Sequence, residues 1–227
     1  MRLGGLQACS LIDYPGHISA VVFTIGCNFR CPYCHNPELV DETAPELTEE
    51  SFFSFLENRN RQLEAVTITG GEPTLQQDLV PFISQIKKMG FKVKLDTNGT
   101  KPGLIKELQK QQLVDYFAMD IKSPLAHYEA TTSRPVDTDK IRQSIAYLMQ
   151  GGIPYEFRTT VVKALLSPED ILTIGQEIAG ASQYFLQRFT AGKLLNPGFV
   201  RKTTYSDEEL SKMCTQLQTY VNRCEIR

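Results

Sequence analysis

The sequence predicts an α/β fold, a partial (β/α)6 TIM-like barrel that is open on one side. Short runs of β-branched and apolar residues recur along the chain, and segments with apolar residues at helical spacing separate them. This alternation is typical of a parallel sheet with helical crossovers. The strand-like runs are residues 18–25, 65–69, 91–95, 116–119, 155–162 and 183–189. Because six such units are two short of a closed eight-stranded barrel, we expect an open sheet, with a doubly wound sheet as the alternative.

Capping residues locate the helices of the second half of the chain. Ser167 followed by Pro168 is typical of an N-cap with proline in the first turn. Ser206-Asp207-Glu208-Glu209 has the pattern of a capping box, so we expect a C-terminal helix over about 206–223. Residues 123–137 contain two prolines and three consecutive Thr or Ser residues, and this composition predicts a loop.

Length and composition favour one globular domain over residues 1–227. Hydrophobic residues make up 41% of the chain and charged residues 22%, which is ordinary for such a domain. The net charge of -2 provides no basic surface for nucleic acid. The N-terminus lacks the apolar core of a signal peptide, and no apolar run approaches membrane-spanning length. We therefore expect a cytoplasmic protein with reduced thiols and with neither a nucleic-acid nor a membrane partner.

Three cysteines follow the first predicted strand, in a loop over residues 26–37. Cys27, Cys31 and Cys34 have the spacing C-x3-C-x2-C. Thiolates are soft donors that suit zinc, copper(I) and iron–sulfur clusters. A closed zinc site or an ordinary [4Fe–4S] cluster takes four protein ligands. Three thiols therefore indicate a cluster in which one iron is left open for substrate.

Other readings of these cysteines are weaker. His35 would complete a Cys3His zinc site, but it adjoins Cys34, and adjacent side chains rarely reach one tetrahedral ion from a tight loop. A disulfide is weaker still, because the number is odd and nothing indicates export. Cys9, Cys214 and Cys224 lie elsewhere; the last two are expected on the final helix, too far apart to share a face, and all three are interpreted as free thiols.

Polar motifs follow the next three predicted strands at their carboxyl ends. They are Gly70-Gly71-Glu72-Pro73, Asp96-Thr97-Asn98-Gly99 and Asp120-Ile121-Lys122, while Arg158 and Gln187 lie within the fifth and sixth strands. The carboxyl ends of parallel strands meet at one edge of the sheet, where α/β proteins bind their ligands. The repeated placement at one end predicts a single site, of which Gln187 is the least certain member.

The cysteine loop and the Gly-Gly-Glu-Pro turn resemble the radical S-adenosylmethionine (SAM) superfamily. The resemblance covers nearly the whole chain, and its cysteine motif is highly specific. It implies that Cys27, Cys31 and Cys34 hold a [4Fe–4S] cluster, whose fourth iron binds the amine and carboxylate of SAM. It also implies that an electron from the reduced cluster cleaves SAM, and that the 5′-deoxyadenosyl radical then abstracts a hydrogen atom.

The resemblance also implies a set of SAM contacts. Tyr33 would lie beside the adenine, although a packed loop aromatic is an equal reading. Gly70 and Gly71 would let the backbone approach the ligand, and Glu72 would accept a hydrogen bond from the SAM ammonium. The complete set of expected contacts is Tyr33, Gly70, Gly71, Glu72, Thr97, Asn98, Asp120, Lys122 and Arg158.

A narrower resemblance, to the activating enzymes of glycyl-radical enzymes, rests on Cys34-His35-Asn36-Pro37 and on the motifs that begin at Asp96 and Asp120. It implies that Lys122 pairs with the SAM carboxylate. It further implies that Asp96 and Asp120, with Thr97 and a backbone carbonyl near Ala118, hold a monovalent cation, for which hard oxygen donors are suitable. The alternative is that the two aspartates only cap loops.

The start of the chain and the cysteine loop are most similar to activating proteins of anaerobic (class III) ribonucleoside-triphosphate reductase. Residues 5–16 and 26–39 carry this similarity. The implied partners are that glycyl-radical enzyme and an electron donor such as flavodoxin or ferredoxin. Alternatives are an activase for a pyruvate formate-lyase type of partner, a radical SAM enzyme acting on a small molecule, and an iron–sulfur or zinc module without enzymatic activity.

Overall fold

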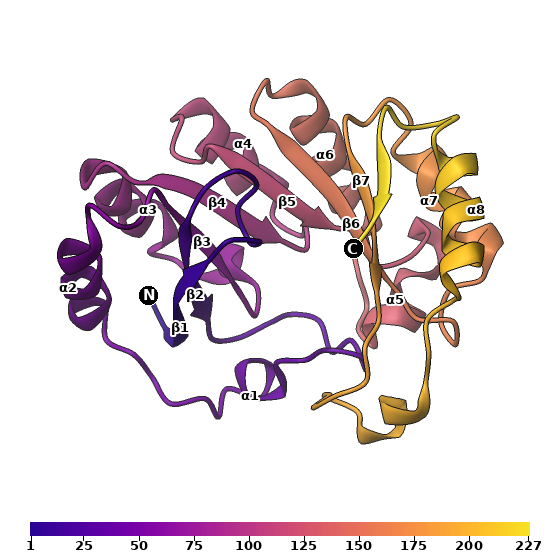
Figure 1. The fold of residues 1–227 in the computed structure, drawn as a ribbon, viewed down its shortest axis with the longest axis horizontal. Helices are drawn as coiled ribbons and strands as arrows, with labels where there is room; N and C mark the ends of the chain where they lie inside the picture. The colour runs from indigo at the N-terminus through magenta and orange to yellow at the C-terminus, as the bar shows by residue number, and fades with distance from the viewer.

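The computed structural model describes residues 1–227 and contains one eight-stranded sheet with its strands in chain order, β1 to β8 (Figure 1). β1 is antiparallel to β2, and all the other neighbouring pairs are parallel. The strands are β1 (Leu3–Ser10), β2 (Ser19–Thr24), β3 (Ala65–Gly70), β4 (Lys92–Thr97), β5 (Tyr116–Asp120), β6 (Tyr155–Val161), β7 (Tyr184–Arg188) and β8 (Cys224–Ile226).

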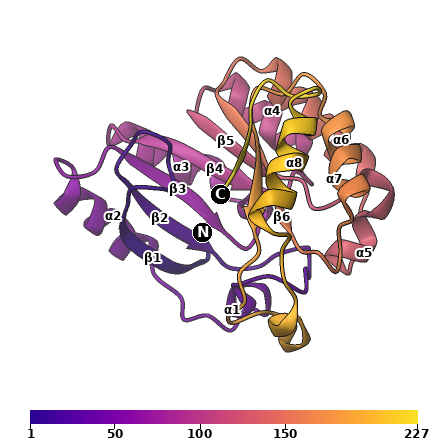
Figure 2. The ribbon, with the colours of Figure 1, turned by 45° about the vertical axis from the view of Figure 1, so that its right-hand side comes forward.

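Helices follow one another around the outside of the curved sheet (Figures 1 and 2). A cluster of 50 buried residues forms the main apolar core. The helices are α1 (Pro37–Val40), α2 (Glu49–Arg59), α3 (Leu79–Lys88), α4 (Pro102–Lys110), α5 (Tyr128–Thr132), α6 (Thr138–Gln150), α7 (Pro168–Glu177) and α8 (Asp207–Leu217). Short 3-10 helices lie at Pro73–Leu75 (η1), Leu125–His127 (η2) and Pro197–Arg201 (η3). None of the helices is both long and apolar enough to cross a bilayer.

The predicted open α/β barrel is confirmed, and the six predicted strands correspond to β2–β7. The two edge strands were not predicted. β1 contains Gly4 and Gly5 and exposes its second half, so it lacks the alternating apolar pattern of a buried strand. β8 has only three residues, which is too short for periodicity to register.

The chain after α7 also differs from the prediction. α8 begins with the predicted capping box at Ser206, but it ends at Leu217 rather than near residue 223. Asn222 then donates a backbone hydrogen bond to Ala181, and β8 pairs with β7. These tertiary hydrogen bonds replace the ones that a longer helix would make.

The placement of Cys214 and Cys224 on one helix is therefore wrong. Cys224 lies on β8, and its Sγ is 2.7 Å from the Sγ of Cys214 on α8, with both residues buried. The prediction of a loop over 123–137 is also wrong in part, because η2 and α5 fall within it. The capping box at Ser167, by contrast, opens α7 with Pro168 in its first turn.

Candidate active site

A cavity of about 430 Å³ opens at the carboxyl ends of the parallel strands. This volume lies within the range of small-molecule sites. The lining contains most of the residues that the sequence placed in one site, namely Cys27, Cys31, Tyr33, Cys34, Gly70, Glu72, Asp96, Thr97, Asn98, Asp120, Lys122 and Gln187. Gly71 and Arg158 do not line the cavity and lie directly behind residues that do. The structure therefore brings together side chains that are up to 160 residues apart in sequence (187 − 27).

The cysteine loop is held against the turn that follows β3. The Glu72 N–H donates to the Gly26 carbonyl at 2.8 Å. A Cβ on Gly71 would lie only 2.0 Å from that same carbonyl oxygen, so the approach requires glycine. Gly26 itself has φ of +94°, in the region that favours glycine. Local backbone chemistry therefore fixes where the loop begins.

The three thiols share one wall of the cavity, but their sulfurs do not converge into a preformed set of three metal ligands. Cys31 is buried, and Cys27 and Cys34 are half-buried. Burial raises the pKa of the Cys27 thiol to about 12, and it also raises the pKa of Cys31, against the attraction of Lys122. Because metals bind thiolates, a metal or cluster would have to displace these protons as it draws the sulfurs together.

A segment after β7 forms the outer support of the cysteine loop. Leu195 N donates to the Cys34 carbonyl at 2.9 Å, and Asn196 N donates to the Pro32 carbonyl at 3.0 Å. The ring of His35 stacks on Phe189, with 6.1 Å between their centroids. Sequence reasoning missed this segment, because backbone contacts between distant loops leave no side-chain pattern.

Glu72 is buried beside the cavity and is surrounded by donors. Its Oε1 accepts from the backbone and hydroxyl of Thr74 and, at 2.7 Å, from the Thr97 hydroxyl. Its Oε2 accepts only from the backbone N–H of Asn98, at 2.6 Å. Burial raises the pKa of Glu72, although these hydrogen bonds oppose the shift. Oε2 is thus the oxygen with capacity for a further donor.

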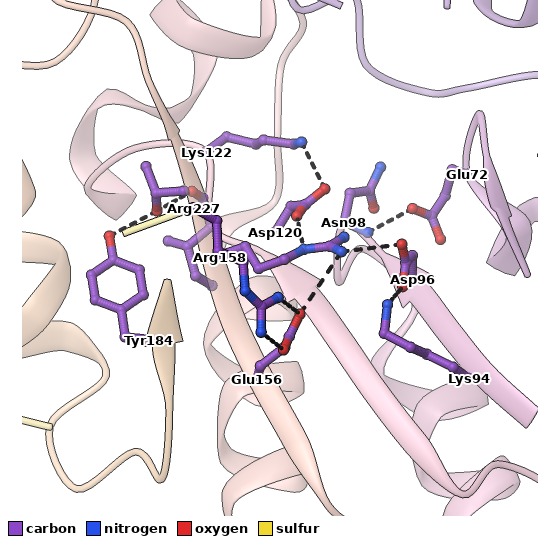
Figure 3. A network of polar contacts seen from close by, with 12 residues as sticks. Glu72, Lys94, Asp96, Asn98, Asp120, Lys122, Glu156, Arg158, Tyr184 and Arg227 are labelled. Atoms are coloured by element: carbon purple, nitrogen blue, oxygen red, sulfur yellow. Dashed lines mark hydrogen bonds and ion pairs between the residues drawn. The ribbon is translucent and has the colours of Figure 1, made fainter. Parts of the chain in front are cut away.

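A chain of ion pairs joins β4, β5 and β6 and ends at Lys122, two residues after β5 (Figure 3). Lys94 contacts Asp96 Oδ1, and Arg158 NH1 contacts Asp96 Oδ2 at 3.1 Å. Arg158 Nε donates to Asp120 Oδ1 at 2.8 Å, and Lys122 Nζ donates to Asp120 Oδ2 at 3.1 Å. Each oxygen of both aspartates therefore has a cationic partner from the chain itself.

These pairs keep the network ionised. Burial alone would raise the pKa of Asp120, but Arg158 and Lys122 outweigh burial and hold that pKa well below its usual range. The pKa of Asp96 is lowered in the same way by Arg158 and Lys94. Burial would lower the pKa of Lys122, but Asp120 raises it, so the ammonium is retained at neutral pH.

The network continues toward β8 through residues that the sequence did not predict. Glu156 is fully buried and accepts two hydrogen bonds from the Arg227 guanidinium, at 3.0 and 3.1 Å, and one from the Tyr116 hydroxyl at 2.9 Å. One signal for Glu156 was available, because residues two apart on a strand share a face and Glu156 precedes Arg158 by two. No comparable signal exists for Arg227, which lies on no predicted strand.

Residues 21–174 match the sequence model of the family described as the Radical SAM superfamily. The chain belongs to the radical SAM superfamily. This is a family of enzymes that use a [4Fe–4S] cluster and SAM, the two cofactors that the resemblance of the cysteine motif implied.

Relatives narrow the family. A protein of Methanocaldococcus jannaschii with the name "Putative glycyl-radical enzyme activating enzyme" is 34% identical over 230 residues, which cover 99% of this chain and 95% of that protein. The pyruvate formate-lyase-activating enzyme of Clostridium pasteurianum is 35% identical over 127 residues, 53% of this chain and 52% of that enzyme. This radical SAM chain is thus a member of the glycyl-radical enzyme activating group, and its match spans about half the length of the formate-lyase activase.

Solved structures support the fold. Streptococcus suis SuiB bound to its precursor peptide SuiA has a TM-score of 0.70 and 14% identity, over 91% of this chain and 48% of that chain. SuiB bound to S-adenosylmethionine has a TM-score of 0.68 and 14% identity, over 89% of this chain and 48% of that chain. At this identity the likeness shows the radical SAM fold alone.

The cavity fits a polar cofactor of this radical SAM family. The hydroxyl of Tyr33 is buried and has no hydrogen-bond partner in the chain. A buried polar atom without a partner is costly, and a bound ligand would relieve that cost. The cavity also presents both kinds of charge, with the Lys122 ammonium and the Glu72 carboxylate on its wall, and the methionyl group of SAM carries both a carboxylate and an ammonium.

Proposed function

We propose that this chain is an activase that generates a glycyl radical on an anaerobic (class III) ribonucleoside-triphosphate reductase. The observation that carries the proposal is that three cysteines, Glu72, Asp120 and Lys122 line one cavity at the carboxyl ends of the parallel strands. The cluster, when bound and reduced, supplies the electron that breaks the sulfur–C5′ bond of SAM. The 5′-deoxyadenosyl radical takes a hydrogen atom from the α-carbon of one client glycine, which yields 5′-deoxyadenosine, methionine and the glycyl radical.

In this proposal the chain's own residues hold the cluster and orient SAM. Cys27, Cys31 and Cys34 ligate three irons. Glu72 accepts a hydrogen bond from the SAM ammonium at Oε2, the oxygen with the single internal donor. Lys122 pairs with the SAM carboxylate. Its ammonium is available because it donates a single hydrogen bond within the chain, to Asp120 Oδ2.

The remaining proposed contacts are supportive. The Tyr33 hydroxyl, which has no internal partner, lies beside the adenine. Gly70 and Gly71 admit the ligand close to the backbone, while Thr97 and Asn98 hold Glu72 in place through the hydrogen bonds described above. Arg158 acts through Asp96 and Asp120, which it contacts directly.

A monovalent cation at Asp96, Thr97 and Asp120 stays a prediction. Lys94, Arg158 and Lys122 already contact the four carboxylate oxygens of the two aspartates. A bound cation would have to share those oxygens through their second lone pairs. Comparing SAM binding in potassium and in tetramethylammonium buffers of equal ionic strength tests this, because only potassium is small enough to enter.

Two features support a polypeptide client. The sheet is open rather than closed, since β1 and β8 are separate edges, and an open barrel admits a protein loop. SuiB, which shares the fold, has been solved with a precursor peptide. The similarity of residues 5–16 and 26–39 to ribonucleotide reductase activases supports the choice of client, and an electron donor of the flavodoxin or ferredoxin kind is part of the proposal.

A direct experiment is to mix the reduced, cluster-loaded protein with SAM and an anaerobic ribonucleotide reductase and to record the electron paramagnetic resonance spectrum. We expect a glycyl doublet that disappears when SAM is omitted or when the client's radical glycine is replaced by alanine. If the enzyme releases one equivalent of 5′-deoxyadenosine but no doublet appears on this client, the choice of partner is contradicted.

A formate-lyase type of client is the second candidate. The named pyruvate formate-lyase-activating enzymes among the relatives favour it. A doublet with a formate-lyase and none with the reductase in the same assay would establish this candidate instead.

A further inference from the structure

Glu156 is a buried carboxylate outside the cavity that holds the proposed SAM site. It lies on β6, two residues before Arg158, so both side chains point into the interior of the open barrel (Figure 3). Its side chain is 0% exposed. An ionised carboxylate at such a position requires a cationic partner and further donors.

Two cations lie within reach of Glu156. Arg227, which follows β8, makes two hydrogen bonds to it, at 3.0 and 3.1 Å. Arg158 NH1 is 4.0 Å from Glu156 Oε1, at the limit of an ion pair. The guanidinium of Arg227 also lies over the ring of Phe185, 3.4 Å from its centroid. Arg227 is therefore the guanidinium that satisfies Glu156.

The hydrogen bonds of Arg158 go to the two aspartates instead. Its Nε donates to Asp120 at 2.8 Å, and its NH1 contacts Asp96 at 3.1 Å. Since guanidinium–carboxylate pairs are strongest when both groups make hydrogen bonds, the three carboxylates compete for this one side chain. Its position beside the two aspartates depends on Glu156 having another partner.

We propose that Arg227 is a positioning residue that, by satisfying Glu156, leaves Arg158 to hold Asp96 and Asp120 in the cavity wall. Asp120 in turn contacts Lys122 at 3.1 Å. The positions of Asp120 and Lys122 in the cavity wall therefore depend on Arg227, which follows β8. The consequence for SAM rests on the function proposed above, whereas the placement of Arg158 does not.

The proposal predicts an asymmetry between two substitutions. In Arg227→Gln, Glu156 loses its bidentate guanidinium partner and draws Arg158 away from Asp120. In Glu156→Gln, the charge that competes for Arg158 is removed, so Arg158 stays with the aspartates. The double variant Glu156→Gln/Arg227→Gln should therefore resemble the wild type. A merely structural anchor for β8 would behave differently, because either single change would then break the same contact.

The first readout is the 15N–1H signal of the Arg158 Nε–H in the full-length chain purified anaerobically, assigned with Arg158→Lys. We expect this signal to shift in Arg227→Gln and to return in the double variant. Arg223→Gln is the matched control, since Arg223 is exposed and pairs only with Glu225. An unchanged Arg158 signal in Arg227→Gln, or a signal that shifts equally in Arg223→Gln, would overturn the proposal.

The second readout is the dissociation constant of SAM for the cluster-loaded protein. We expect the affinity for SAM to fall on the order of tenfold in Arg227→Gln, in keeping with coupling between neighbouring charged side chains. Glu156→Gln and the double variant should bind SAM with wild-type affinity. A loss in Glu156→Gln as large as in Arg227→Gln would refute the positioning role.

If Arg227→Gln does not fold, the double variant tests the proposal, because it also lacks Arg227. The proposal requires that the double variant bind SAM with wild-type affinity. If the wild type itself does not bind SAM, the proposed function fails while the spectrum of Arg158 still decides the positioning role.

Discussion

The two halves of the sheet build the cavity in different ways. β2–β5 contribute short motifs at their carboxyl ends, and these motifs place backbone groups and side chains directly on the cavity wall. β6–β8 contribute few residues to the wall. Two charged side chains of β6, Arg158 and Glu156, lie inside the barrel and contact the aspartates or Arg227, which follows β8. In the proposed function, the first half would supply the groups that bind the cofactors, and the second half would keep those groups in position.

This difference has a physical origin. A loop after a strand can present several adjacent residues to a ligand, so its function is concentrated in a contiguous motif. A side chain inside the barrel meets partners from other strands at register positions, so its function depends on residues that are far apart in sequence. Substitutions in the two halves should therefore have different kinds of consequence.

The largest difference is expected between two buried cysteines. Cys31→Ala, in the first half, should abolish both the cluster and the cleavage of SAM, because one iron loses its ligand. Cys214→Ala, on α8 beside β8, should leave both intact, since the Cys214 thiol lies beside that of Cys224 and does not line the cavity. Iron and sulfide analysis and the yield of 5′-deoxyadenosine measure the outcome. Retention of a full cluster in Cys31→Ala would contradict the assigned ligand set.

The next effect concerns Lys122, which is largely buried in the cavity wall. Lys122→Ala should weaken SAM binding by about 1.5–3 kcal/mol, because it removes a charge-assisted hydrogen bond. Lys101→Ala, an exposed lysine at the start of α4, serves as the control and should not change the affinity. Equilibrium dialysis with labelled SAM gives both values. Equal affinities of Lys122→Ala and the wild type would remove Lys122 from the site.

Substitution of two glycines compares a close contact with backbone, at Gly71, with a close contact with side chains, at Gly175. A Cβ at Gly71 would lie 2.0 Å from the Gly26 carbonyl oxygen. A Cβ at Gly175 on α7 would instead meet side chains, the flexible end of Leu217 at 2.4 Å and the ring of Tyr220 at 3.3 Å. Gly71→Ala should therefore destabilise the protein by at least about 1–3 kcal/mol, and Gly175→Ala by less. Urea unfolding compares them, and a greater loss in Gly175→Ala would show that the cysteine loop can shift without cost.

The smallest expected effect lies where the halves meet, at the pair Asp120–Arg158. The pKa of Asp120 is held below its ordinary value of 3.8, so the native state binds a proton less readily than the unfolded chain does. The stability that this pair contributes is then fully present above pH ~4–5 and is lost as the pH falls below about 3.8. The difference in the free energy of unfolding between the wild type and Asp120→Asn, measured with urea, should shrink as the pH falls below about 3.8. A constant difference from pH 7 to 3 would show that Asp120 does not depend on its charge.

Sequence reasoning recovered strands β2–β7 and most of the cavity wall. The cysteine spacing, the Gly-Gly-Glu turn and the two aspartate motifs are contiguous, and strand order alone brings their ends together. β1 and β8 were missed because glycines obscure the pattern of one and the other is too short for a pattern. Glu156 was within reach, since its spacing from Arg158 places both on one face of β6.

Other features had no signal in the sequence. The support that Leu195 and Asn196 give to the cysteine loop consists of backbone hydrogen bonds between distant loops, which any residue except proline can make. The proximity of Cys214 to Cys224 depends on where α8 ends, and tertiary pairing of β8 rather than a local stop residue sets that end. Arg227 could be assigned only once β8 was known to lie beside β7.

The interior of this barrel holds Lys94, Glu156, Arg158 and two aspartates, whereas barrel interiors are usually filled with branched aliphatic residues. Exchanging buried ion pairs for well-packed apolar side chains is often neutral or even stabilising, by about 1–4 kcal/mol. Directed evolution that selects only for heat resistance would therefore tend to replace these charges with valine and leucine. The resulting variants would survive heating and be catalytically silent, so thermal screens of this fold need a parallel selection for turnover.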